Sequence, residues 1–128
     1  MKAKVTVTEY NPLNEYSLKQ FAAFAGGDQE NLREILVSFI SSGKKNAELF
    51  KQSIEDENVI MISELSHKML PLYRQLEAKN IVGLLSQLEQ KDIQSPGNEM
   101  YYSIAKSALY MIETLLLNIQ KREEISLG

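Results

Sequence analysis

The sequence has no cysteine and no tryptophan, and only one histidine and three prolines among its 128 residues. Without cysteine there is no disulfide framework, no thiolate nucleophile and no cysteine-based zinc site. Apolar runs such as residues 115–117 are far shorter than the roughly 20 residues of a membrane-spanning helix. Residues 1–14 lack the apolar stretch of a secretory signal. We therefore expect a cytoplasmic chain with no membrane contact of its own.

The charge balance gives no reason to expect a nucleic-acid partner. Fourteen Lys and Arg residues against seventeen Asp and Glu residues give a net charge of −3. Such a chain has no basic field to attract a phosphate backbone. Its length fits one domain, and no repeat or interior linker suggests a second. We expect a monomer, with residues 1–16 as an extended arm or linker and residues 17–128 as a single helical domain.

Apolar residues recur at intervals of three and four along most of the chain, which is typical of amphipathic helices. Ser17 is a candidate N-cap for a short helix ended by Gly26 and Gly27, because glycine accepts the left-handed conformation of a helix C-terminus. Four longer helices follow, with turns of a few residues between them: 28–55, 58–78, 81–91 and a last one after the turn at 95–98. The prediction is an all-α fold, an antiparallel up-and-down four-helix bundle with a short extra N-terminal helix.

The only histidine, His67, falls on the polar side of the predicted helix 58–78. At 100° per residue it points away from the apolar stripe of that helix, which consists of Met61, Ile62, Leu65, Met69, Leu72 and Leu76. An imidazole turned outward from a helix is available to solvent and to a partner. The function of this histidine has to be inferred from the residues around it.

Residues 62–78 resemble the signature of histidine-containing phosphotransfer (HPt) domains, the helical carriers of multistep two-component phosphorelays. The family has a small residue before the histidine, here Ser66, and an apolar residue two after it, here Met69. It ends in a motif like Leu-Gly-Ala, which here reads Leu-Glu-Ala at residues 76–78. The similarity extends from about residue 28 to residue 89. The chain departs from the pattern where the family has lysine and glycine, three and four residues after the histidine: Leu70 and Pro71 stand there.

The resemblance implies that His67 accepts a phosphoryl group from an aspartate of a response-regulator receiver domain and passes it to another receiver. Such a chain is a carrier without kinase activity of its own. It needs no cofactor, because Mg²⁺ is expected on the receiver partner. The module could be free-standing, or the C-terminal part of a hybrid sensor kinase and so tethered to a membrane sensor.

The missing family lysine leaves the charge partner of a phosphorylated His67 open. Lys68 is the first candidate and Arg74 the second, since a cation can neutralise a phosphoryl group. Three lysines of the preceding helix are also predicted to lie roughly level with His67: Lys44, Lys45 and Lys51.

Proline at position 71 has no amide hydrogen to donate to the carbonyl of His67, so a kink or local loosening is expected there. The face around His67 is more apolar than a solvated helix face needs to be, which is typical of a docking site. The residues predicted to line the receiver contact are Ile60, Ser63, Glu64, Leu70 and Pro71.

Two other functions compete with phosphotransfer. Glu64 and His67 have the spacing of a di-iron carboxylate helix, but such a site uses that motif twice with further inward glutamates, and this chain has one histidine. We therefore expect no metal site. The alternative that stays open is an all-helical adaptor, which binds a partner through an apolar face and makes no chemical use of His67.

Overall fold

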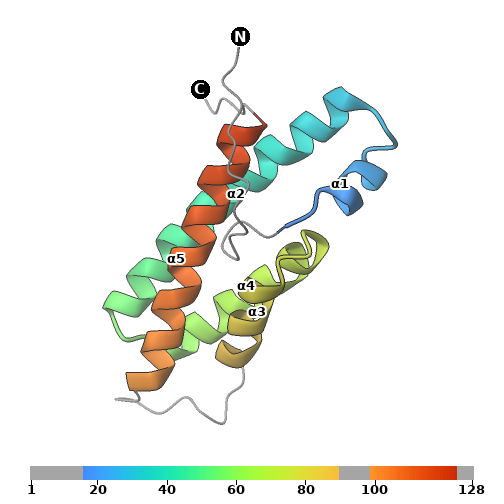
Figure 1. Ribbon diagram of the computed structural model, residues 1–128. Coiled ribbons are helices and arrows are strands. Elements are labelled where there is room, and N and C mark those ends of the chain that lie inside the picture. The colour runs from blue at the N-terminus through green and yellow to red at the C-terminus, as the bar shows by residue number, and fades with distance from the viewer. Residues whose placement is uncertain (1–15, 90–98, 124–128) are drawn as a thin grey trace.

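The computed structural model describes residues 16–89 and 99–123, and this part of the chain is helical with no strand. The helices are α1 (Lys19–Phe24), α2 (Gln29–Glu55), α3 (Val59–Gln75), α4 (Lys79–Leu88) and α5 (Glu99–Arg122) (Figure 1). The all-α prediction is confirmed. The predicted arm, apart from residue 16, and the predicted turn at 95–98 lie outside the described residues.

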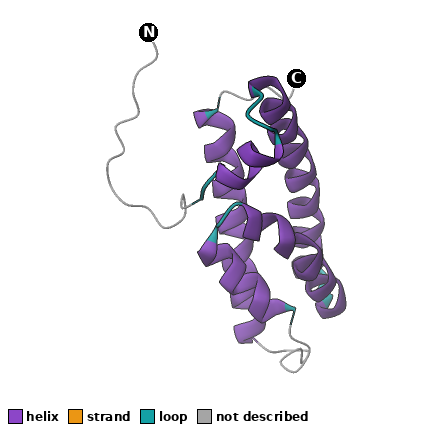
Figure 2. Ribbon diagram, turned by 90° about the vertical axis from the view of Figure 1, so that its right-hand side faces the viewer, coloured by secondary structure: helices purple, strands orange, loops and turns teal. Residues whose placement is uncertain are grey.

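Within the set α2 to α5, each helix packs against two of the others. Helix α2 contacts α3 and α5, and α4 contacts the same two helices, while the short α1 packs against α2. The two longest helices, α2 and α5, run side by side (Figures 1 and 2). Gly43 of α2 allows this approach, because a Cβ atom at its position would lie 2.9 Å from Cδ2 of Leu116.

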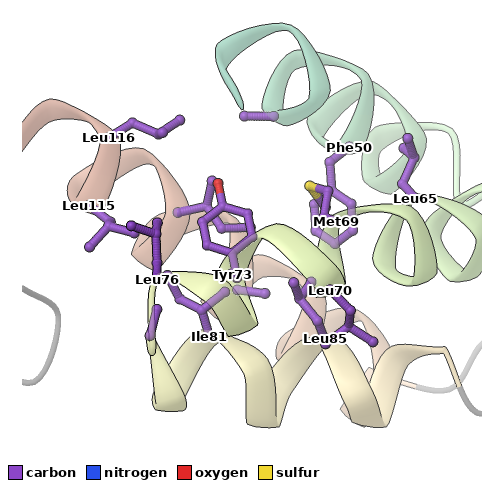
Figure 3. Close-up of a cluster of buried hydrophobic side chains, with 14 of the residues drawn as sticks. Phe50, Leu65, Met69, Leu70, Tyr73, Leu76, Ile81, Leu85, Leu115 and Leu116 are labelled. Atoms are coloured by element: carbon purple, nitrogen blue, oxygen red, sulfur yellow. The ribbon is translucent and has the colours of Figure 1, made fainter. Parts of the chain in front are cut away.

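All five helices contribute to one hydrophobic core. Figure 3 shows its centre, where Tyr73 of α3 and Leu76, the C-cap of that helix, lie among side chains from α4 and α5. Met69 lies beside Phe50 of α2. Because α3 is covered by α2 on one side and by α4 on the other, only part of its circumference reaches solvent. His67 lies on that exposed part.

Helix α2 begins one residue after the predicted start at residue 28. Asp28 is its N-cap, and the carboxylate accepts hydrogen bonds from the amides of Glu30 and Asn31. The N-cap of α1 is Leu18, one residue after the predicted Ser17, although Ser17 Oγ still accepts a hydrogen bond from the amide of Lys19. Ser17 thus provides a hydrogen-bond acceptor for a backbone amide of the first helical turn, although it lies one residue before the N-cap.

The C-termini of α1, α2 and α3 share one geometry, in which the residue after the C-cap is left-handed. In α1 that residue is Gly26, with φ of 67°, as glycine predicts. In α2 and α3 it is a glutamate, Glu57 with φ of 52° and Glu77 with φ of 56°. At the end of α3 the amide of Ala78 donates to the carbonyl of Tyr73, which closes a Schellman motif. The resemblance suggested by the sequence has glycine where Glu77 stands, and a positive φ is the conformation that glycine adopts most readily.

We expect Glu77→Gly to raise the free energy of unfolding by about 1 kcal/mol, because glycine adopts a positive φ without the steric cost of a Cβ atom. Urea unfolding followed by circular dichroism measures the change. Glu113→Gly is the matched control, since Glu113 is exposed inside α5 and glycine there should cost about 1 kcal/mol. A loss of stability in both variants would contradict the role assigned to the left-handed turn.

Candidate functional site

His67 stands in the middle of α3, and its side chain is 82% exposed. This agrees with the helical phase expected from the sequence. Asn58 caps the start of the helix by accepting a hydrogen bond from the amide of Met61, which fixes where the helical turns begin. The orientation of His67 therefore follows from the helix start and from the burial of the opposite side.

The imidazole has a partner that the sequence analysis missed. Nδ1 of His67 lies 2.7 Å from Oε2 of Glu89, the C-cap residue of α4. Glu89 is 22 positions further along the chain, so only the packing of α4 against α3 brings the two together. An ionised carboxylate can only accept hydrogen bonds, so a neutral imidazole in this pair carries its proton on Nδ1 and keeps a lone pair on Nε2.

The end of α4 that carries Glu89 is held by two side-chain hydrogen bonds to backbone carbonyls. Ser63 Oγ of α3 donates to the carbonyl of Glu89 at 3.3 Å, and the Tyr101 hydroxyl of α5 donates to the carbonyl of Leu88 at 2.9 Å. Burial raises the pKa of Tyr101 to about 12, with a smaller contribution from Tyr102, so the phenol keeps its proton at neutral pH. The backbone that positions the carboxylate is therefore fixed from two helices.

The predicted docking residues separate into two groups. Ile60, Glu64 and Pro71 are exposed on the same side of α3 as His67, as expected. Ser63 and Leu70 are buried, at 6% and 1% exposure, so the prediction that they line a partner contact is wrong. The reason is the position of α4, which covers this side of α3: Ser63 bonds to Glu89, and Leu70 points toward α4 near Leu85 (Figure 3).

The buried side of α3 is also rotated relative to the predicted apolar stripe. Met61 and Leu72, which were expected in the stripe, are exposed, while Ser66 and Tyr73 are buried. Ser66 is tolerated in the core because its hydroxyl donates to the carbonyl of Ile62 one turn earlier. Contact with α4 as well as α2 widens the buried sector and moves its centre toward α4.

The structure brings no candidate cation into contact with the imidazole. Lys68 and Arg74 are exposed on α3; Arg74 is within 20° of His67 around the helix but about 10 Å further along it, whereas Lys68 is adjacent but turned by about 100°. Lys44 lines a groove formed by residues of α2 and α5, and among the described residues no contact joins it to His67. Lys45 and Lys51 are exposed on α2, without a contact to His67 in the part of the chain described.

The described residues hold no group of three or more side chains that could bind a metal ion. None of the described helices is long and apolar enough to cross a membrane. In the comparisons with known proteins, no family model, no curated protein and no solved structure matches the chain. The site must therefore be interpreted from its own geometry.

Proposed function

We propose that this chain is a phosphorelay carrier of the HPt type, which accepts a phosphoryl group on His67 from a receiver aspartate and passes it to another receiver. The observation that carries the proposal is the exposed imidazole of His67, held at Nδ1 by Glu89. We further propose that α2 to α5 form an antiparallel up-and-down four-helix bundle, with α1 as the short extra helix. The packing of each of these helices against two others supports this arrangement.

The acceptor in a phosphoryl transfer needs little covalent machinery of its own. The acceptor must offer a nitrogen lone pair that can approach the phosphorus in line with the leaving oxygen. That approach must not be blocked by a neighbouring side chain. An outward imidazole on a fixed helix meets both needs. The receiver would bring Mg²⁺ to its own aspartyl phosphate, so this chain acts without a cofactor of its own.

The contact with the receiver would cover the exposed side of α3, with Ile60, Glu64 and Pro71 around His67. Ile60 is 68% exposed, a large apolar side chain that a docked partner would remove from water. Lys68 and Arg74 are the cations of α3 available to a phosphorylated His67. Their flexible side chains must move toward the imidazole to reach it.

Because His67 is the only histidine, phosphohistidine formation can be assigned without mapping. The full chain is incubated with ³²P-labelled receiver domains, phosphorylated beforehand with a small-molecule phosphodonor. We expect a label on the chain that is labile in acid and stable in base, and its loss in His67→Gln. If several receivers leave wild-type and His67→Gln proteins equally unlabelled, the proposal fails.

A second candidate function rests on a different surface. A groove of about 470 Å³ lies between α1, α2 and α3, lined by apolar side chains that include Phe21, Phe24, Phe39 and Leu72. Phe24 is 86% exposed at this groove. The adaptor alternative would use it to bind a partner segment. Partner binding that Phe24→Ala abolishes and His67→Gln leaves unchanged would favour the adaptor over the carrier.

A further inference from the structure

We propose that the groove between α1, α2 and α3 binds a small linear amphiphile, an apolar chain that carries a positively charged head group. The inference goes beyond the phosphorelay function and concerns a different surface. Leu72, where α3 borders the groove, is turned by about 140° from His67 around the helix. A molecule in the groove would therefore leave the imidazole exposed.

The groove is lined by aromatic side chains. Phe21 and Phe39 are buried beside it, with ring centroids 5.6 Å apart in an edge-to-face contact. Phe24 borders it from α1 and is 86% exposed. A phenylalanine so exposed contributes little burial to the fold, whereas an apolar chain in the groove would remove its ring from water. The apolar part of the occupant is therefore expected against Phe24.

The groove is long and narrow. Its α2 side runs from Asn31 to Ser42, which is about 16 Å at the rise of an α-helix. Spread over that length, the volume of about 470 Å³ corresponds to a cross-section of about 30 Å². This cross-section is less than half that of a helix about 10 Å across. The groove thus admits one extended chain rather than a whole helix of a partner protein.

An alkyl chain suits this groove better than an extended peptide. The groove is bordered by helices, whose backbone amides and carbonyls bond within the helix and offer no ladder to a second backbone. Peptide groups buried without hydrogen-bond partners are costly. An alkyl chain has no polar group to satisfy, so only the head group of the occupant needs a polar partner.

The charge at the groove selects that head group. Among the described residues that line it, Glu34 is the only charged one, and it is exposed. A carboxylate attracts an ammonium group and repels the carboxylate or phosphate of an anionic lipid. Ammonium groups also interact favourably with the faces of phenylalanine rings. The groove therefore favours an amine or a quaternary ammonium over a fatty acid.

Three probes with the same alkyl chain test the proposal: octyltrimethylammonium, 1-octanol and octanoate, each below its micelle concentration. They are titrated into the ¹⁵N-labelled full chain, and the backbone amide shifts give the site and the dissociation constant. We expect saturable shifts at Phe24, Ser38 and Ser42. The cation should bind about threefold to fivefold more tightly than the alcohol, as expected for a partly solvated charge pair, and octanoate should bind most weakly.

Two variants and one control test the assigned roles. Glu34→Gln should remove the preference for the cation over the alcohol. Glu48→Gln should keep it, because Glu48 is an exposed carboxylate of α2 that lines the groove on the α5 side. Phe24→Ala should weaken the binding of all three probes.

Equal affinity for the cation and octanoate, a preference that survives Glu34→Gln, or shifts confined to other parts of the chain would overturn the inference. If none of the three probes binds, the inference is also overturned, and the partner segment of the adaptor alternative becomes the candidate occupant. None of these measurements uses phosphoryl transfer, so their outcome is independent of the carrier function.

Discussion

Leu70→Lys is expected to lower the free energy of unfolding by at least about 3 kcal/mol, although lysine is the residue that HPt domains have at this position. Leu70 is 1% exposed in the core between α3 and α4. An ammonium group there would lose its hydration, and such burial is among the largest single-residue costs. Urea unfolding of the full chain measures the change.

Leu72→Lys is the matched control, because it introduces the same side chain two residues later at a position that is 37% exposed. There the ammonium can reach water along its own methylene chain, so the cost should stay below about 1 kcal/mol. Equal losses in the two variants, or a negligible loss in Leu70→Lys, would contradict the burial of Leu70. Either result would also mean that a lysine three residues after His67 can serve as the charge partner of the phosphorylated histidine.

Pro71→Ala is expected to have the opposite effect, a gain in the free energy of unfolding of about 3 kcal/mol. Pro71 is exposed and lies inside α3, where proline removes a backbone donor and crowds the preceding turn of the helix. Alanine restores an amide that can donate to the carbonyl of His67. Thermal and urea unfolding measure the gain, and hydrogen exchange of the new amide reports whether that bond forms.

Lys68→Ala is the control for Pro71→Ala, since it also places alanine at an exposed position of α3 but restores no backbone donor. Its stability should stay within about 0.5 kcal/mol of the wild type. An equal change in the free energy of unfolding of both variants would show that Pro71 does not destabilise the helix more than another exposed residue does. If Pro71→Ala gains stability but loses phosphoryl transfer, the proline serves the partner contact rather than the fold.

The features set by local patterning could be predicted from the sequence. The alternation of apolar and polar residues gave the helices, Asp28 gave the start of α2, and Gly26 gave the turn after α1. The phase of the helix that begins after Asn58 was enough to turn His67 outward. Each of these depends on residues within a few positions of one another.

The remaining features depend on which helix covers which side of α3. Ser63 and Leu70 look partly exposed on an isolated helix and are buried only because α4 packs over them. Glu89 lies near the end of a different helix, and no spacing rule links it to His67. The resemblance to HPt domains that the sequence suggests extends to residue 89 but gives that residue no role.

The most direct test of the account is the fate of phosphate on the only histidine. After incubation of the full chain with phosphorylated receiver domains, mass spectrometry and ³¹P NMR should show one phosphoryl group on Nε2 of His67. A second, unphosphorylated receiver should then remove it, and His67→Gln should carry none. A chain that stays unmodified with every receiver tested, or carries phosphate on another residue, would contradict the carrier function.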